Sequence, residues 1–155
     1  MPNTIQEFFA DATEKAAVDL EAAYLKLPAD KRQWNPAPKA RSAADQVAEC
    51  VLLNTNSATL LHARVFDPKF DMAAFVKKQT EIMQNEEALL PALRESAAQA
   101  VAAIRAVPDS DLSVEVPMPW GAMSLTRIIA YPYWNMGYHE GQITYIASLL
   151  ETAGE

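Results

Sequence analysis

Glycine is scarce in this sequence, and its scarcity narrows the folds that the chain can adopt. Only four of the 155 residues are glycine, alanine is abundant, and β-branched residues rarely cluster. Alanine has the highest helix propensity, whereas strands favour β-branched and aromatic residues. The sequence therefore predicts an all-α fold.

Helical periodicity divides the chain into a few long segments. Apolar residues recur at helical spacing in four of them, at residues 3–27, 43–63, 85–108 and 124–150. A shorter helix is expected at 71–78, an extended excursion at 109–121, and a bend at Pro91 in the third long helix. Four long helices in a chain of this length predict a single domain, residues 1–155, folded as a four-helix bundle with a long crossover connection.

The segment between the first two long helices is a proline-containing linker. Pro36 and Pro38 exclude a helix at 34–41, and we expect Trp34 to pack this linker against the core. Ser42, followed by Asp45, is typical of a residue that caps the next helix.

The charge pattern argues against several classes of partner. The 13 Lys and Arg residues against 20 Asp and Glu give a net charge of −7, with no run of basic residues, so we expect neither a nucleic acid nor a membrane as partner. No stretch is apolar enough to span a bilayer, the N-terminus lacks the pattern of a signal peptide, and Cys50 is the single cysteine. We therefore expect a soluble, cytoplasmic protein.

One face of the last helix combines apolar ends with a polar centre. Its residues are Ile128, Pro132, Asn135, His139, Gln142, Ile146 and Leu149. Burying the two amides and the imidazole without partners would cost about 1–3 kcal/mol each, so the stripe predicts a polar pocket inside the bundle.

Ordinary structural roles must be considered for the same residues. A single helical histidine such as His139 is commonly a hydrogen-bonded core or surface residue. The neighbouring aromatic face, formed by Tyr131, Trp134, Tyr138 and Tyr145, suits either core packing or a homodimer interface. Cys50 is expected to be a small buried apolar residue.

Three motifs, taken in order, resemble the DinB-like superfamily of small bundles over essentially the whole chain. They are residues 34–49 (WNPAPKARSAADQVAE), Pro119-Trp120-Gly121, and His139-Glu-Gly-Gln142-Ile143. The resemblance implies a four-helix bundle with a long crossover, often dimeric, and a divalent-metal site commonly built from three histidines.

The resemblance also indicates where such a site would lie. The three histidine positions fall on Glu49, Asn135 and His139, so one histidine of three is retained. The ion would be Zn, Ni or Mn, and this set should bind zinc and nickel more weakly than three imidazoles do, because oxygen donors replace nitrogen. The alternative is a metal-free pocket in which Glu49 and His139 form an ion pair or a hydrogen bond across the bundle, with Asn135 and Gln142 satisfying the remaining polar groups.

Two functional hypotheses follow. The resemblance implies a metal-dependent transferase that uses a low-molecular-weight thiol, with Gln142 orienting the ligand. Without a metal, His139 paired with Glu49 could act as a general base. The second hypothesis is a non-enzymatic protein that binds a small molecule or forms a homodimer.

Overall fold

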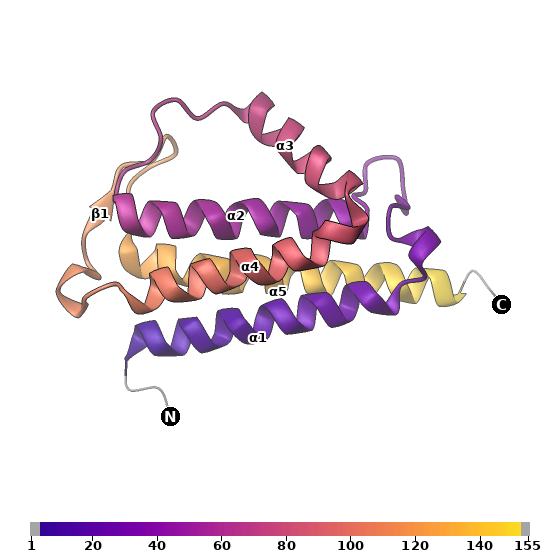
Figure 1. The fold of residues 1–155 in the computed structure, drawn as a ribbon, viewed down its shortest axis with the longest axis horizontal. Coiled ribbons are helices and arrows are strands. Elements are labelled where there is room, and N and C mark those ends of the chain that lie inside the picture. The colour runs from indigo at the N-terminus through magenta and orange to yellow at the C-terminus, as the bar shows by residue number, and fades with distance from the viewer. Residues whose placement is uncertain (1–3, 153–155) are drawn as a thin grey trace.

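A computed structural model describes residues 4–152, in which four long helices form a bundle (Figure 1). These are α1 (Ile5–Lys26), α2 (Ala43–Ala63), α4 (Glu86–Arg105) and α5 (Leu125–Thr152). A shorter helix, α3 (Met72–Gln84), lies between α2 and α4 in the sequence. The all-α, four-helix-bundle prediction is confirmed.

Helices that are consecutive in the sequence do not lie side by side in the bundle. α1 and α2 each pack mainly against α4 and α5, so α1 and α2 occupy opposite corners, as do α4 and α5. α1 and α5 run in one direction and α2 and α4 in the other (Figure 1). The connections at 27–42 and 106–124 therefore cross the two ends of the bundle, as the predicted crossover requires.

Side-chain caps stand at the start of four helices, α1 to α4, and Thr4 is the cap of α1. Ser42 Oγ accepts a hydrogen bond from the backbone N–H of Asp45 at 3.2 Å, as the sequence predicted for α2. Asp71 caps α3 and Asn85 caps α4 in the same way. The prediction that α3 ends near residue 78 was wrong, because Ile82 and Met83 pack against the core and extend it to Gln84.

The predicted extended excursion contains a very short hairpin. Strand β1 (Glu115–Val116) pairs antiparallel with β2 (Met123–Ser124), with Glu115 opposite Ser124. Gly121 lies between the strands at a φ of 115°, a conformation that L side chains rarely adopt, so glycine is required at this turn. Trp120, next to Gly121 in this turn, lines a cavity together with Tyr131 of α5.

The linker is held in a different way from the one that the sequence suggested. Trp34 is exposed, so the prediction that it packs the linker against the core was wrong. Instead, the Arg32 guanidinium lies 5.0 Å from the centre of the Tyr24 ring, and the Arg32 carbonyl accepts from the Ala44 N–H at 2.9 Å. These contacts fix the chain immediately before α2.

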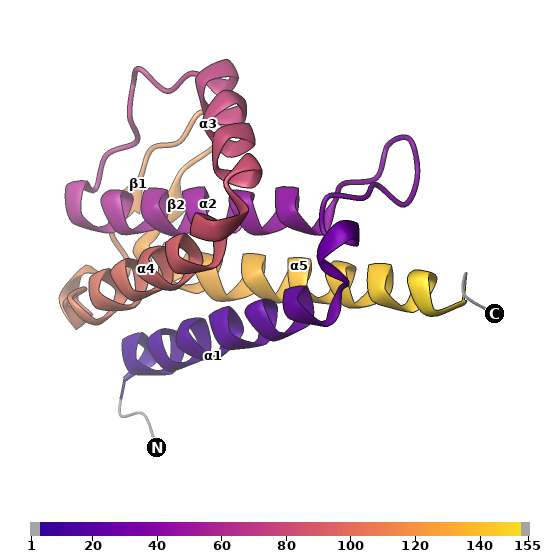
Figure 2. The same ribbon diagram turned by 45° about the vertical axis from the view of Figure 1, so that its right-hand side comes forward.

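Helix α3 covers one side of α2 without entering the bundle. Figure 2 shows it rising away from α2 and α4, with the hairpin strands and the α2–α3 connection beside it. Among its residues only Gln79 is buried. A cavity, described below, lies between α3, the hairpin and the bundle.

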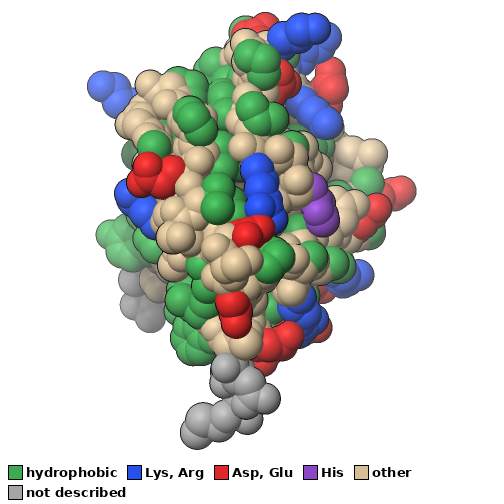
Figure 3. All heavy atoms as spheres, turned by 90° about the vertical axis from the view of Figure 1, so that its left-hand side faces the viewer, with side chains coloured by type: hydrophobic (Ala, Val, Ile, Leu, Met, Phe, Trp, Pro, Cys, Tyr) green, Lys and Arg blue, Asp and Glu red, His purple; other side chains and the backbone are tan. Residues whose placement is uncertain are grey.

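The molecular surface does not concentrate basic charge at the end of the bundle seen in Figure 3. There, Lys and Arg side chains are scattered among Asp and Glu, with hydrophobic side chains between them. Within residues 4–152, no helix combines the length and hydropathy that crossing a bilayer requires.

Two leucines of α1 provide a matched test of the packing. Leu20 is fully buried, whereas Leu25 is 49% exposed. We expect Leu20→Ala to lower the free energy of unfolding by about 2–5 kcal/mol and Leu25→Ala by less than about 1 kcal/mol. Urea denaturation measures both, and equal losses would contradict this packing of α1.

Candidate functional site

The polar stripe of α5 faces the interior, as the sequence predicted. Asn135 and His139 are each 3% exposed, and Gln142 is half-buried. Their side chains face α2, which packs against α5. The buried polar groups therefore meet in the interface between these two helices.

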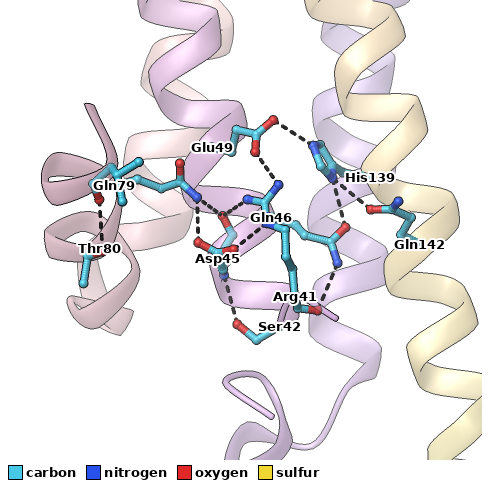
Figure 4. A network of polar contacts seen from close by, with 10 residues as sticks. Arg41, Ser42, Asp45, Gln46, Glu49, Gln79, Thr80, His139 and Gln142 are labelled. Carbon is cyan, nitrogen blue, oxygen red and sulfur yellow. Dashed lines mark hydrogen bonds and ion pairs between the residues drawn. The ribbon is translucent and has the colours of Figure 1, made fainter. Parts of the chain in front are cut away.

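His139 is surrounded by oxygen atoms from both helices (Figure 4). Its Nδ1 lies 2.9 Å from Gln46 Oε1 and 3.2 Å from Gln142 Oε1, and its Nε2 lies 3.2 Å from Glu49 Oε1. Gln46 uses its amide nitrogen to donate to the Arg41 carbonyl at 3.3 Å, which fixes Oε1 toward the imidazole. Both oxygens beside Nδ1 belong to amides and can only accept, so Nδ1 carries a hydrogen, while Nε2 faces the carboxylate of Glu49.

Glu49 is held between His139 and Arg41. His139 approaches one carboxylate oxygen, and the Arg41 guanidinium donates to the other. The hydrogen bond from His139, followed by the charge and hydrogen bond of Arg41, lowers the pKa of Glu49 despite its partial burial. Glu49 is therefore a carboxylate at neutral pH.

Arg41 extends the network from the linker to α3. Its Nε donates to Asp45 Oδ2 at 2.5 Å and its Nη2 to the Asp45 carbonyl at 3.2 Å. Asp45 in turn accepts from Gln79 Nε2 at 2.6 Å, through its other carboxylate oxygen. One continuous set of contacts thus runs from α5 through α2 and the linker to α3 (Figure 4).

Asn135 lies apart from this network. Its amide nitrogen lies 3.5 Å from the sulfur of Cys50, which is completely buried, as expected for a small apolar residue. Burial raises the pKa of the Cys50 thiol well above its ordinary value, so the thiol stays protonated and is a poor nucleophile.

The donor set fits a metal ion poorly. Both Glu49 oxygens already have a partner, Arg41 or His139, and Asn135 turns its amide nitrogen toward Cys50. Across residues 4–152, no group of three or more His, Cys, Asp or Glu side chains is placed to hold a metal ion. The metal site at Glu49, Asn135 and His139 stays a prediction, and we assign it no chemical step.

A cavity of about 560 Å³ opens on the other side of Glu49. Its wall is mainly apolar and comes from α2, the α2–α3 connection, α3, the hairpin and α5. The aromatic residues in this wall are Phe66, Phe70, Phe75, Trp120 and Tyr131. Arg41 and Glu49 are the charged residues that line it. This size and composition are typical of small-molecule sites.

Sequence reasoning found three members of the polar network and missed four. Glu49, His139 and Gln142 were predicted, whereas Arg41, Asp45, Gln46 and Gln79 were not assigned to the site. Gln46 lies one turn before Cys50 on the buried face of α2, and that spacing was an available signal. Nothing local to residues 72–84 indicates that Gln79 would meet Asp45.

The aromatic face of α5 is mostly outside the core. Trp134, Tyr138 and Tyr145 are 53–65% exposed, so core packing is wrong for these three residues. Tyr131 is half-buried and lines the cavity. Trp134 stacks on Tyr138 with ring centres 5.7 Å apart.

The fold resembles those of two solved structures. YfiT from Bacillus subtilis, described as a probable metal-dependent hydrolase with an unusual four-helix bundle topology, superposes with a TM-score of 0.80 at 13% identity, over 97% of this chain and 90% of YfiT. An uncharacterised protein from Clostridium difficile 630 superposes with a TM-score of 0.64 at 13% identity, over 94% of this chain and 98% of the other. No family model and no curated protein matches the sequence. The chain thus has a fold like that of YfiT, and the four-helix bundle expected from the resemblance is confirmed.

The pKa of Glu49 makes a prediction about acid stability. Its pKa is lower in the folded chain than its ordinary value of 4.5, so ionised Glu49 stabilises the fold above about pH 4.5. That contribution is lost as the pH falls through the folded-state pKa. We expect the difference in unfolding free energy between wild type and Glu49→Gln to shrink from pH 5.5 to pH 2.5.

Urea denaturation at several pH values measures this difference. Glu14→Gln, which changes an exposed glutamate of α1, is the matched control and should show little pH-dependent difference. A Glu49→Gln difference that stays constant across the range would contradict the ion-paired state of Glu49.

Proposed function

We propose that this chain is a DinB-like protein that binds a small organic molecule in the cavity beneath α3. The observation that carries the proposal is the cavity itself, about 560 Å³, aromatic along its wall, with Glu49 and Arg41 at its edge. Apolar burial supplies affinity in such a site, and a few fixed polar groups orient the ligand. The polar network holds Glu49 and Arg41 in place before a ligand arrives.

The geometry supports binding better than proton transfer. A carboxylate whose pKa is lowered is a weaker base, and Glu49 is such a group. His139 directs Nε2 at Glu49 and Nδ1 at Gln46, so both nitrogens are engaged within the protein. General-base catalysis by His139 would require Nε2 to leave Glu49, and we assign His139 the role of positioning Glu49.

A cavity-filling variant tests ligand binding. Leu53 lines the cavity, and Leu53→Trp places an indole inside it. We expect Nile red, a neutral apolar dye, to bind the wild type at one site with a blue shift in emission, and Leu53→Trp to weaken binding about ten-fold or more. Fluorescence titration measures both.

The control places the same side chain elsewhere. Leu25 is exposed on α1, away from the cavity, so Leu25→Trp should leave dye affinity unchanged. Equal binding by Leu53→Trp and wild type would show that the dye uses another surface and would overturn the assignment of the cavity.

A metal-dependent hydrolase or thiol transferase is the second candidate function. The description of YfiT as a probable metal-dependent hydrolase favours it. A divalent ion such as Zn, Ni or Mn would take Glu49, Asn135 and His139 as ligands, and a low-molecular-weight thiol would be the co-substrate. The ion pair between Arg41 and Glu49 opposes it, because the metal would have to displace the guanidinium.

Removing that guanidinium tests the second candidate. We expect calorimetric titration of wild type with zinc to show weak binding, and Arg41→Met to bind zinc about ten-fold more tightly because Glu49 is released. Arg94→Met, which breaks the exposed pair of Arg94 with Glu21, is the control and should match wild type. Tight, stoichiometric zinc in wild type that is lost in His139→Ala would instead favour the metal enzyme.

The exposed aromatic face supports a further proposal about partners. Trp134, Tyr138 and Tyr145 are side chains of the kind that are enriched in protein interfaces. We propose that this face of α5 meets a second copy of the chain in a homodimer, and that neither nucleic acid nor membrane is a partner, given the net charge of −7.

A further inference from the structure

The charged groups at the edge of the cavity are not equally available to a ligand. Arg41 and Glu49 both line the cavity, and they are bonded to each other. The side chain that can still bond to a ligand head group determines whether the cavity prefers a cationic or an anionic ligand.

The Arg41 guanidinium is already neutralised. All three of its nitrogens donate: Nε and Nη2 to Asp45, and Nη1 to Glu49. Two carboxylates thus lie against one guanidinium. An anionic ligand that approached Arg41 would be repelled by Asp45 and Glu49 at short range, and the net charge of −7 adds to this repulsion.

The Glu49 carboxylate keeps capacity to accept. Each of its oxygens has one partner, His139 or Arg41, and a carboxylate offers about four lone-pair sites. His139 is almost fully buried behind Glu49, outside the residues that line the cavity. The acceptor that faces the cavity is therefore the carboxylate, whereas His139 contacts it from the side away from the cavity.

The aromatic wall next to Glu49 also suits a cation. Tyr131 lines the cavity, and burial together with the negative charge of Glu49 raises the pKa of its hydroxyl, which places a neutral phenol near the carboxylate. Phe75 belongs to the same wall. The faces of aromatic rings carry partial negative charge and attract ammonium groups, while their area packs against an apolar ligand body.

We propose that the cavity binds a small molecule with an apolar body and a primary ammonium head, the head bonding to Glu49 and the body lying along the aromatic wall. This inference rests on the proposed function, because it names the class of ligand for the same cavity. In this proposal, Glu49 selects the charge of the ligand head group, and Arg41 holds the Glu49 carboxylate in place.

Three probes that differ in the head group test the selection: 4-phenylbutylamine, 4-phenylbutanoate and 4-phenylbutan-1-ol. They share one apolar body, so differences in affinity report the head group. At pH 7 and low salt, we expect the amine to bind about ten-fold more tightly than the carboxylate, with the alcohol in between, because a charged hydrogen bond distinguishes them. Calorimetry measures the dissociation constants.

An isosteric substitution assigns the preference to Glu49. We expect Glu49→Gln to weaken binding of the amine about ten-fold and to leave the affinity for the alcohol nearly unchanged. The alcohol also reports whether the cavity survives the substitution. Glu14→Gln, an exposed change on α1, should retain the wild-type order of the three probes.

The outcomes separate the two proposals. If none of the three probes binds the wild type, and Nile red does not bind either, the proposed function fails and this inference falls with it. If the alcohol or the carboxylate binds as tightly as the amine, the cavity stands and the charge selection is overturned. The comparison of the three probes on wild type needs no variant, so it tests the inference even if Glu49→Gln does not fold.

Discussion

The burial of one imidazole organises the polar interior of this protein. His139 is 3% exposed, and a buried imidazole is tolerated only if its ring nitrogens find hydrogen-bond partners. Those acceptors come from Gln46 and Glu49 on α2 and from Gln142 on α5 itself. Because Gln46 and Glu49 lie on α2, their contacts with the imidazole also fix the register in which α2 and α5 pack.

Each polar side chain in this network needs a partner of its own, so the contacts extend outward from His139 one residue at a time. Glu49, drawn toward the bundle, takes Arg41 as its second partner, and Arg41 holds Asp45. Asp45 then accepts from Gln79, the single buried residue of α3. The position of α3 over the cavity is thus coupled through hydrogen bonds to a histidine on a different helix.

Short-range sequence patterns explain what could be predicted. Helix positions followed from periodicity and caps, as at Ser42, and the inward face of α5 followed from the spacing of Asn135 and His139. The pairing of Glu49 with His139 was one of two alternatives, and the structure contains that contact. The diagonal arrangement of α1 and α2 and the contact of Gln79 with Asp45 depend on long-range packing, which no local pattern encodes.

Arg41 bears on both proposed functions, because its guanidinium pairs with one oxygen of Glu49, a residue that lines the cavity. A divalent metal bound by Glu49 would have to displace that guanidinium. An organic ligand in the cavity would not, because a carboxylate offers about four lone-pair sites and each Glu49 oxygen receives one contact. The contacts of Arg41 and His139 hold the carboxylate in place, so a ligand would meet a group that is already oriented. The arrangement therefore favours an organic ligand over a metal ion at Glu49.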